Sequence, residues 1–161
     1  MSSFESKFQC PACGSTEFAE QGNFLTCEYC ATQYRKKIQD EPIYPQLVGA
    51  MKDRQEARFD NARKIYDNLI EAHASESGME EAYWGRFLCE QYVIFYHNEH
   101  GEAIPSFWRI NDEKCRDSAS YKKALEYARL SGNAEQYEKE ASLIEEYKEK
   151  YRKVKKEYLN L

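Results

Sequence analysis

Two Cys-x-x-Cys pairs constrain the fold of this chain more than any other feature of its sequence. Cys10 and Cys13 form the first pair, and Cys27 and Cys30 form the second after thirteen intervening residues. Each pair can turn two thiolates toward one point, and four thiolates complete a tetrahedral zinc site with no open position for water. The spacing therefore predicts one structural Zn²⁺ bound by these four cysteines.

The residues around the pairs predict a zinc ribbon over residues 7–38, built from short β-hairpins around the metal. Gly14 supplies the positive φ that commonly follows the second cysteine of such a loop, whereas Ala31 stands at the matching place in the second loop. The second turn is therefore expected to be strained or differently shaped. A segment of about thirty residues buries too little apolar area to fold alone, so the ribbon is expected to unfold without metal.

Two disulfides and a thioredoxin-like redox pair are the alternatives for these cysteines. A redox pair opens a helix, and the residues that follow Cys13 do not predict one. The chain has six cysteines, four of them at a spacing typical of metal ligands, and no secretory signal is recognised before them. This combination predicts a reducing compartment, the cytoplasm. No apolar run approaches the roughly 20 residues of a membrane span, so no membrane partner is expected.

Composition predicts helix for the remainder of the chain. Glycine and proline are scarce, at 7 and 4 residues, while 32% of the residues are charged and 42% are hydrophobic. Two prolines mark residues 39–45 as a linker, and residues 46–161 are expected to form an all-α domain. The ribbon and this domain are expected to have separate cores, so that loss of the metal would leave the helices folded.

Hydrophobic periodicity predicts five helices in this domain. Their expected ranges are 47–57, 59–73, 80–97, 120–130 and 134–158. His73, at the end of the second predicted helix, is expected to be a partly buried residue at the edge of the core or the C-terminal cap of that helix. The third helix is apolar on almost every face and belongs in the middle of the domain, with Cys89 as an inert core residue. The last helix has a seven-residue apolar repeat, interrupted by Glu140.

The connection over residues 98–118 carries Phe107, Trp108 and Arg109. Loops of this length in compact domains are functional or disordered, and the apolar residues argue against disorder. The aromatics plug the helical core, or they form a recognition loop with residue types enriched at interface hot spots. The plug is favoured, because isolated loop aromatics are usually buried locally. Cys115 is expected to be a free surface or half-buried thiol.

An apolar stripe continues along the last helix through Tyr151, Val154 and Tyr158. The neighbouring helices are too short to cover it, so it is expected to lie exposed on a basic segment. An exposed apolar stripe usually marks a partner surface, and the predicted partner is another protein or a second copy of this chain. The alternative is that the helix bends back and buries the stripe against the ribbon.

Parts of the chain resemble known helical repeats. The segments 59–66, 81–84 and 120–127 resemble tetratricopeptide (TPR) helices, in which aromatic and small residues interlock. Over residues 7–150 the chain is similar to a zinc-ribbon plus TPR-like region of multidomain proteins of Gram-positive bacteria, often followed by a Toll/interleukin-receptor-like (TIR) domain. This similarity rests on the two cysteine pairs, Phe59-Asp60-Asn61-Ala62, Ala82-Tyr83-Trp84-Gly85, Ile104-Pro105 with Arg109, and Tyr121-Lys122-Lys123-Ala124-Leu125.

The resemblance implies a small zinc ribbon followed by a TPR-like helical-hairpin domain, whose stacked helices bind peptides or other domains. Members tend to carry a Cys-His pair where this chain has Phe107-Trp108, so any role of that pair is lost here. Their C-terminal effector is not expected in this chain, so any enzymatic activity that the effector carries is not transferred by the resemblance.

The predicted function is that of a non-enzymatic zinc-binding adaptor. The alternative is a nucleic-acid-binding ribbon, in which Arg35-Lys36-Lys37 contacts phosphates and Phe24 or Tyr29 stacks on bases. The formal charge of −5 makes nucleic acid a poor partner. An enzyme has the least support, because phosphate-loop and nucleophile-elbow motifs are absent and His97 and His100 lack a third zinc ligand.

Overall fold

The N-terminal part of the chain is a three-stranded antiparallel sheet with two cysteine loops beside it. The computed structural model describes residues 8–73 and 75–159, without the side chains of residues 158 and 159. Strand β1 (Phe18–Gln21) pairs with β2 (Phe24–Cys27), which pairs with β3 (Gln33–Arg35). Gly22 begins the turn between β1 and β2 with a φ of 56°, which glycine adopts without steric cost. Residues 8–38 are called the cysteine module below.

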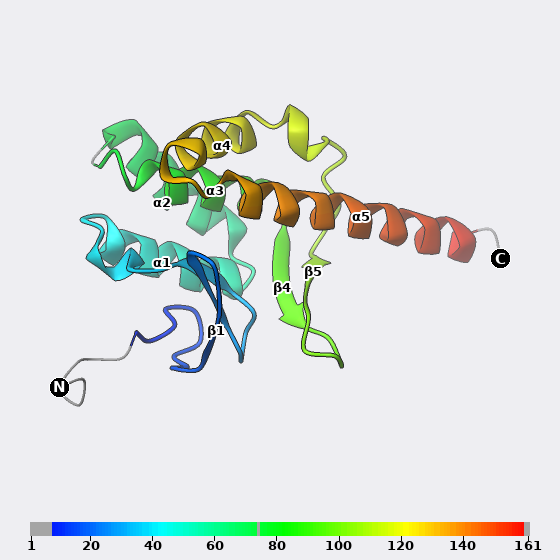
Figure 1. Cartoon of the computed structure of the whole chain (residues 1–161). Helices are drawn as coiled ribbons and strands as arrows, with labels where there is room; N and C mark the ends of the chain where they lie inside the picture. Colours follow the sequence, from blue (N-terminus) through cyan, green and yellow to red (C-terminus); the bar gives the residue numbers. More distant parts are fainter. Residues whose placement is uncertain (1–7, 74, 160–161) are drawn as a thin grey trace.

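Five α-helices follow in the described residues, and a second antiparallel hairpin interrupts them, so the expectation of an all-α domain over residues 46–161 is wrong. In chain order the elements are η2 (Ile38–Asp40), α1 (Tyr44–Gln55), α2 (Phe59–Ala72), α3 (Met79–Glu90), β4 (Val93–His97), β5 (Ala103–Phe107), η3 (Cys115–Asp117), α4 (Ala119–Ser131) and α5 (Ala134–Leu159). Each helix contacts the next one in the chain. Figure 1 shows α5 running across the molecule and continuing beyond the other elements.

The third predicted helix is shorter than expected. It ends at Glu90, and a φ of 52° at Tyr92 turns the chain into β4. The prediction of helix through His97 is wrong because the residues that follow are β-branched and aromatic, which favours a strand once a partner strand is available. That partner is β5, with Val93 opposite Phe107. At the end of α2 His73 takes the cap position with a φ of 46°, as one of its two interpretations expected.

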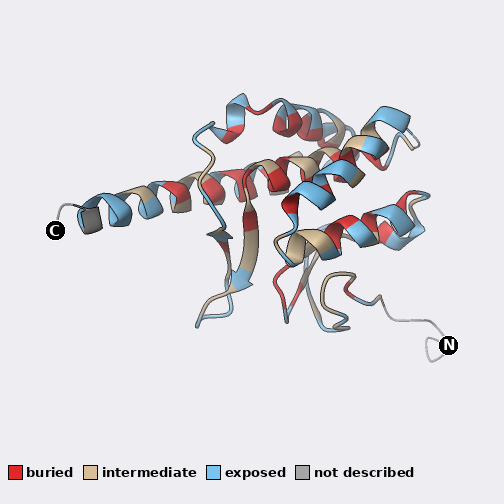
Figure 2. Cartoon of the chain, turned by 180° about the vertical axis from the view of Figure 1, so that it is seen from behind, coloured by how far each residue is buried: buried red, intermediate tan, exposed pale blue. Residues whose placement is uncertain are grey.

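The cysteine module and the helices share their hydrophobic cores. One cluster joins Tyr34 and Ile38 of the module to Tyr66 of α2. A second cluster contains Phe24 of β2, whose ring meets that of Tyr137 on α5 edge-on at 5.4 Å. The expectation of two separate cores is therefore wrong for the described residues. Figure 2 shows that the buried positions of α5 stop before its C-terminal end.

Helices α2 and α3 pack closely where Gly85 meets Tyr66. A Cβ atom at Gly85 would lie 2.1 Å from Cζ of Tyr66, whereas one at Gly49 of α1 would meet Cδ1 of Ile65 at 3.7 Å. We expect Gly85→Ala to lower the free energy of unfolding by about 1–3 kcal/mol, because the added methyl group overpacks the core. Gly49→Ala should raise it by up to about 1 kcal/mol through helix propensity. Denaturant unfolding measures both, and equal midpoints would contradict this packing.

Candidate metal centre

The two cysteine loops repeat the same backbone hydrogen bonds. In each loop the amide of the first cysteine donates to the carbonyl five residues later, and the amide four residues later donates back to that cysteine's carbonyl. The donor of the second bond has a positive φ in both loops, 85° at Gly14 and 63° at Ala31. Ala31 therefore adopts the left-handed backbone at a cost of about 1–2 kcal/mol. The second turn is strained and follows the path of the first.

These loops bring the four predicted cysteines together. Their Sγ atoms lie within 4.8 Å of one another, at 3.7 Å between Cys10 and Cys30 and 3.5 Å between Cys13 and Cys27. A tetrahedral site with metal–sulfur bonds of about 2.3 Å has sulfur–sulfur edges of about 3.8 Å, so the cluster fits a metal ion. A disulfide requires about 2.05 Å, and all six cysteines are free thiols. The disulfide alternative therefore does not describe this structure.

Two hydroxyl groups lie against the sulfur cluster. Oη of Tyr34 is 2.9 Å from Sγ of Cys10, and Oγ1 of Thr32 is 3.0 Å from Sγ of Cys30. Hydrogen bonds from Cys30 and Tyr34 lower the pKa of Cys10 to about 4, whereas the hydrogen bond to Cys10 raises the pKa of Cys30. A bound dication would favour the thiolate form of all four. Thr32 also donates to Gln55 at 3.2 Å, which ties the second loop to α1.

Arg35 of β3 anchors the module to the helices through carboxylates. Its guanidinium lies 2.6 Å from Glu41 and 2.5 Å from Glu81, with Glu80 at 3.9 Å. Burial raises the pKa of Glu81 to about 7, and the charge of Arg35 opposes that rise. Glu80 also accepts hydrogen bonds from Ser131, Asn133 and Tyr137. This network joins the module to α3, α4 and α5.

His97 of β4 connects the hairpin to the second cysteine loop. Its Nε2 lies 2.7 Å from the carbonyl oxygen of Cys27, and its Nδ1 lies 3.2 Å from that of Gly101. His100 is exposed in the turn that follows. The two histidines therefore belong to a β-hairpin and not to the end of the helix predicted over residues 80–97. Within the described ranges, the four cysteines are the one group whose donor atoms are arranged to hold a metal ion.

Three of the residues considered for nucleic-acid contact have partners within the fold. Phe24 is only 4% exposed and cannot stack on a base. Arg35 is held by the carboxylates described above, and Nζ of Lys36 lies 3.5 Å from Glu20. Tyr29 is exposed on the second cysteine loop. The role of Arg35 could not be predicted because two of its three acidic partners, Glu80 and Glu81, are distant in the chain.

The residues predicted for partner binding near β5 have different environments. Phe107 packs against the second core cluster, as the plug interpretation expects. Trp108 is 72% exposed, so the plug interpretation is wrong for this residue. The guanidinium of Arg109 lies 4.0 Å from the ring centre of Tyr92. Trp108 is therefore the accessible aromatic of this segment.

The predicted stripe on α5 is exposed where the structure describes it. Tyr151 is 48% exposed and Val154 is 65% exposed, so neither is buried against the cysteine module. The side chain of Tyr158 lies outside the described residues. The alternative of a helix that buries this stripe internally is therefore wrong for Tyr151 and Val154.

A buried lysine on α5 was not anticipated. Lys148 has no exposed side-chain surface, and its ammonium donates to the side chain of Gln91 and to the carbonyls of Asn111 and Glu113 at 2.8–3.0 Å. It follows Ile144 by four residues, which places both on one helical face. That spacing was the available signal in the sequence. The hydrogen bonds to Asn111 and Glu113 show that Lys148 holds the loop after β5 against α5.

The two remaining thiols are buried. Cys89 lies in the core, as expected, and burial raises its pKa to about 12. Cys115 is 2% exposed, which corrects the expected surface or half-buried position. Burial and the hydrogen bond with Glu145 raise the pKa of Cys115 to about 12. The 370 Å³ pocket beside it is lined by no histidine. Neither thiol is therefore poised as a nucleophile.

Comparison of the chain with models of known families, with curated proteins and with solved structures finds no match in any of the three. None of the helices in the described part of the chain has the length and apolar character needed to cross a membrane.

Proposed function

We propose that the four cysteines hold one structural zinc ion and that the chain is a non-enzymatic adaptor for a protein partner. Four thiolates around one point suit zinc, which takes tetrahedral sulfur ligands without redox chemistry. Four protein ligands leave no position for a water or a substrate, so the proposed role of the metal is to stabilise the fold. Free thiols suit the reducing cytoplasm proposed as its compartment.

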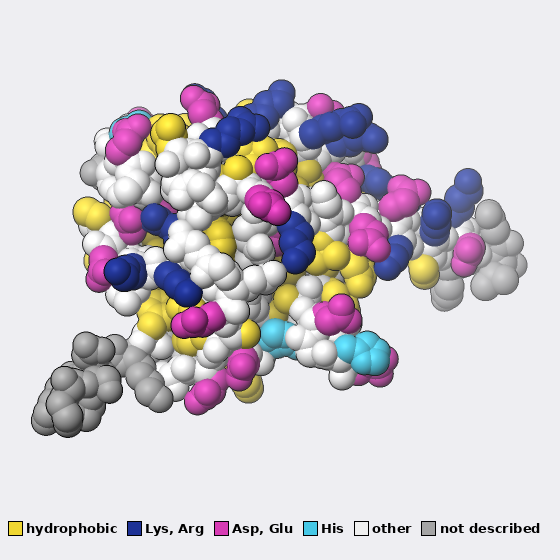
Figure 3. All heavy atoms as spheres, in the orientation of Figure 1, with side chains coloured by type: hydrophobic (Ala, Val, Ile, Leu, Met, Phe, Trp, Pro, Cys, Tyr) yellow, Lys and Arg dark blue, Asp and Glu magenta, His cyan; other side chains and the backbone are white. Residues whose placement is uncertain are grey.

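The observation that carries the adaptor proposal is the exposure of Tyr151 and Val154 on α5. This part of the helix extends beyond the other elements (Figure 1), and its surface combines apolar and basic groups (Figure 3). An aromatic and an aliphatic residue one turn apart form the kind of stripe that a partner covers. Trp108 offers a second exposed aromatic, of a type enriched at interface hot spots.

The proposed architecture is a ribbon followed by TPR-like helix pairs, as in the Gram-positive proteins that the sequence resembles. Consecutive helix contacts from α1 to α5 support this arrangement. The nucleic-acid alternative is weakened by the positions of Phe24 and Arg35. An enzymatic role has little support, because the thiols of Cys89 and Cys115 are buried and because His97 and His100 belong to the β4–β5 hairpin.

The adaptor proposal is tested with Tyr151→Ser combined with Val154→Ser. We expect at least one protein of the source cells to be enriched by about tenfold or more on the native chain and lost on this variant, because hot-spot truncations of this size remove most of the affinity. Quantitative affinity capture measures the enrichment, and sedimentation equilibrium detects a second copy as the partner.

Lys153→Ser combined with Lys155→Ser is the matched control, since it changes exposed basic residues of the same helical segment. This control should keep most of the captured protein. If the native chain and the Tyr151/Val154 variant have the same mass in solution and the same captured proteins, the exposed stripe is not a docking face.

A further inference from the structure

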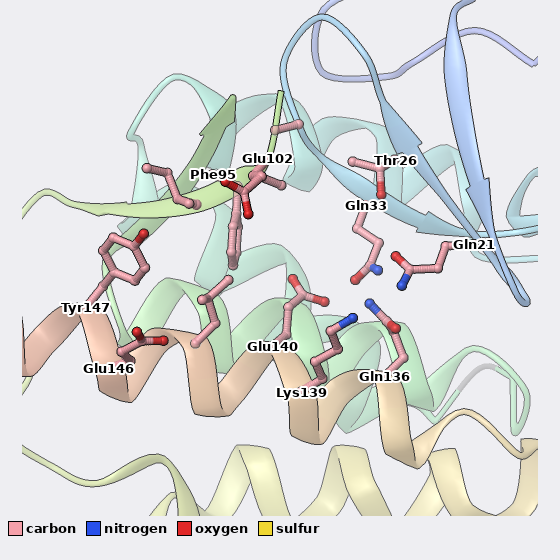
Figure 4. Close-up of a pocket in the computed structure, with 14 residues that line it drawn as sticks. Gln21, Thr26, Gln33, Phe95, Glu102, Gln136, Lys139, Glu140, Glu146 and Tyr147 are labelled. Atoms are coloured by element: carbon pink, nitrogen blue, oxygen red, sulfur yellow. The ribbon is translucent and has the colours of Figure 1, made fainter. Parts of the chain in front are cut away.

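A pocket of about 510 Å³ lies where the cysteine module, the β4–β5 hairpin and α5 meet (Figure 4). Its volume is within the range of about 300–1,000 Å³ that small-molecule sites occupy. The pocket is separate from the four-cysteine cluster and from the exposed stripe on α5. Its walls come from three segments far apart in the chain.

One end of the pocket is polar. Figure 4 shows the side-chain ends of Gln21, Gln33, Gln136, Lys139 and Glu140 directed toward one another. Oε2 of Glu140 and Oε1 of Gln33 are buried and accept no hydrogen bond from the residues that the structure describes. Buried acceptors are nearly always paired, because an unpaired one loses its hydration without replacement. The polar end therefore suits a group that donates hydrogen bonds.

The charges of the lining residues indicate the sign of that group. Three carboxyl groups line the pocket, from Glu102, Glu140 and Glu146, and two of them, those of Glu102 and Glu146, are exposed; the pocket has a single ammonium, that of Lys139. This excess of acid opposes a phosphate or a carboxylate and favours a cation. Glu140 is the buried member of the three, so its interaction with a cation is the least screened by water.

The other end of the pocket is mostly apolar, with Glu146 at its edge beside Tyr147 (Figure 4). Phe95 of β4, Ile104 of β5, and Leu143 and Tyr147 of α5 line it. Aromatic and aliphatic walls beside a few convergent polar groups are typical of sites for organic ligands. A ligand that fills the pocket therefore carries its polar head and its apolar body at opposite ends.

We propose that this pocket binds an organic cation, namely a protonated amine or guanidinium attached to an apolar body. Glu140 and Gln33 accept hydrogen bonds from the cationic head, and the body lies against Phe95 and Tyr147. A free small molecule and the basic side chain of a peptide share this chemistry. The site does not depend on the adaptor function proposed above.

Binding is coupled to a proton on Glu140. Burial raises the pKa of this carboxyl to about 8, and the charge of Arg54 on α1 opposes the rise. The other titratable groups around it are Glu102 beside β5 and, on α5, Tyr137, Lys139, Glu146 and Tyr147. Glu140 is thus mostly protonated at pH 7, and a cation that binds its carboxylate displaces close to one proton.

Calorimetric titration of the intact, metal-loaded protein with 3-phenylpropylamine tests the proposal. We expect this amine to bind at least about tenfold more tightly than 3-phenylpropan-1-ol, which has the same body without the charge. Titrations at pH 7 in buffers of different ionisation enthalpy should show release of close to one proton. Acetylated and amidated Phe-Arg is the second probe: tighter binding of this dipeptide identifies a peptide side chain as the source, and weaker binding identifies a free amine.

Three variants on α5 complete the test. Glu140→Gln should weaken amine binding by about tenfold or more and abolish proton release, because it removes the charged acceptor. Lys139→Gln should strengthen binding by about two- to fivefold by removing a like charge. Glu138→Gln, exposed and outside the pocket, should change neither.

The proposal is overturned if neither probe binds, if the alcohol binds as tightly as the amine, or if Glu140→Gln leaves binding unchanged. Circular dichroism checks the fold of each variant. If Glu140→Gln does not fold, the Lys139→Gln result decides, and unchanged or weaker binding there overturns the proposal.

Discussion

Cys27→Ser is expected to release the metal and to unfold the helices together with the cysteine module. The proposed zinc contributes about 10–16 kcal/mol of apparent binding free energy that is available only to the folded module, whereas a whole domain is stable by about 5–15 kcal/mol. Loss of the module also removes Tyr34 from one core cluster and Phe24 from the other. The helices would then expose both clusters to water.

Metal analysis by mass spectrometry and circular dichroism at 222 nm measure the two effects. The native chain should carry one zinc, and the variant should carry close to none and lose most of its helical signal at 37 °C. Cys115→Ala is the control, because it removes a thiol outside the cluster and should keep the metal. A Cys27→Ser protein that retains zinc, or that keeps a native helical transition without it, contradicts this account.

Arg35→Met is expected to lower the free energy of unfolding by about 3–5 kcal/mol, because it leaves buried carboxylates without their cation. Glu80 and Glu81 have side chains that are 3% and 7% exposed. Denaturant unfolding measures the loss. The loss should be larger at pH 8 than at pH 5, since protonation of Glu81, whose pKa is already raised to about 7 by burial, relieves the unpaired charge.

Arg58→Met is the matched control for this prediction. Arg58 contacts Asp53 and Glu56, but its side chain is 52% exposed, and such surface pairs contribute about 0–1 kcal/mol. Adding Glu81→Gln to Arg35→Met should recover part of the lost stability. Equal effects of Arg35→Met and Arg58→Met would show that the module is not anchored by this network.

The positions of the cysteines and of most helices could be predicted from sequence because they depend on local spacing. For the Cys-x-x-Cys pairs and for the apolar stripe of α2, the pattern within a short segment is enough to predict the local structure. The end of α3 could not, because Val93 and its neighbours suit a buried helix as well as a strand. Their state was decided by pairing with β5.

The roles of residues with partners far away in the chain could not be predicted from the sequence either. Arg35 reads as part of a basic triplet, yet its partner Glu81 is 46 residues away. Lys148 reads as part of a basic helix end, yet its ammonium is held by carbonyls more than 30 residues earlier. The pocket around Glu140 is formed by three segments that are far apart in the chain. The only local indication of it in the sequence was Glu140 itself, which interrupts the apolar repeat of the last helix.

The anchoring of the cysteine module also sets an order of events during synthesis. Asn23 beside β2 donates to Asn133 at the start of α5, 110 residues later, and a ribosome adding about 5–20 residues per second needs about 5–20 s to make that stretch. Through that interval the emerging module lacks the helix against which Phe24 packs. Metal captured early by the cysteines would hold the nascent hairpins in register until α5 leaves the exit tunnel and closes over them.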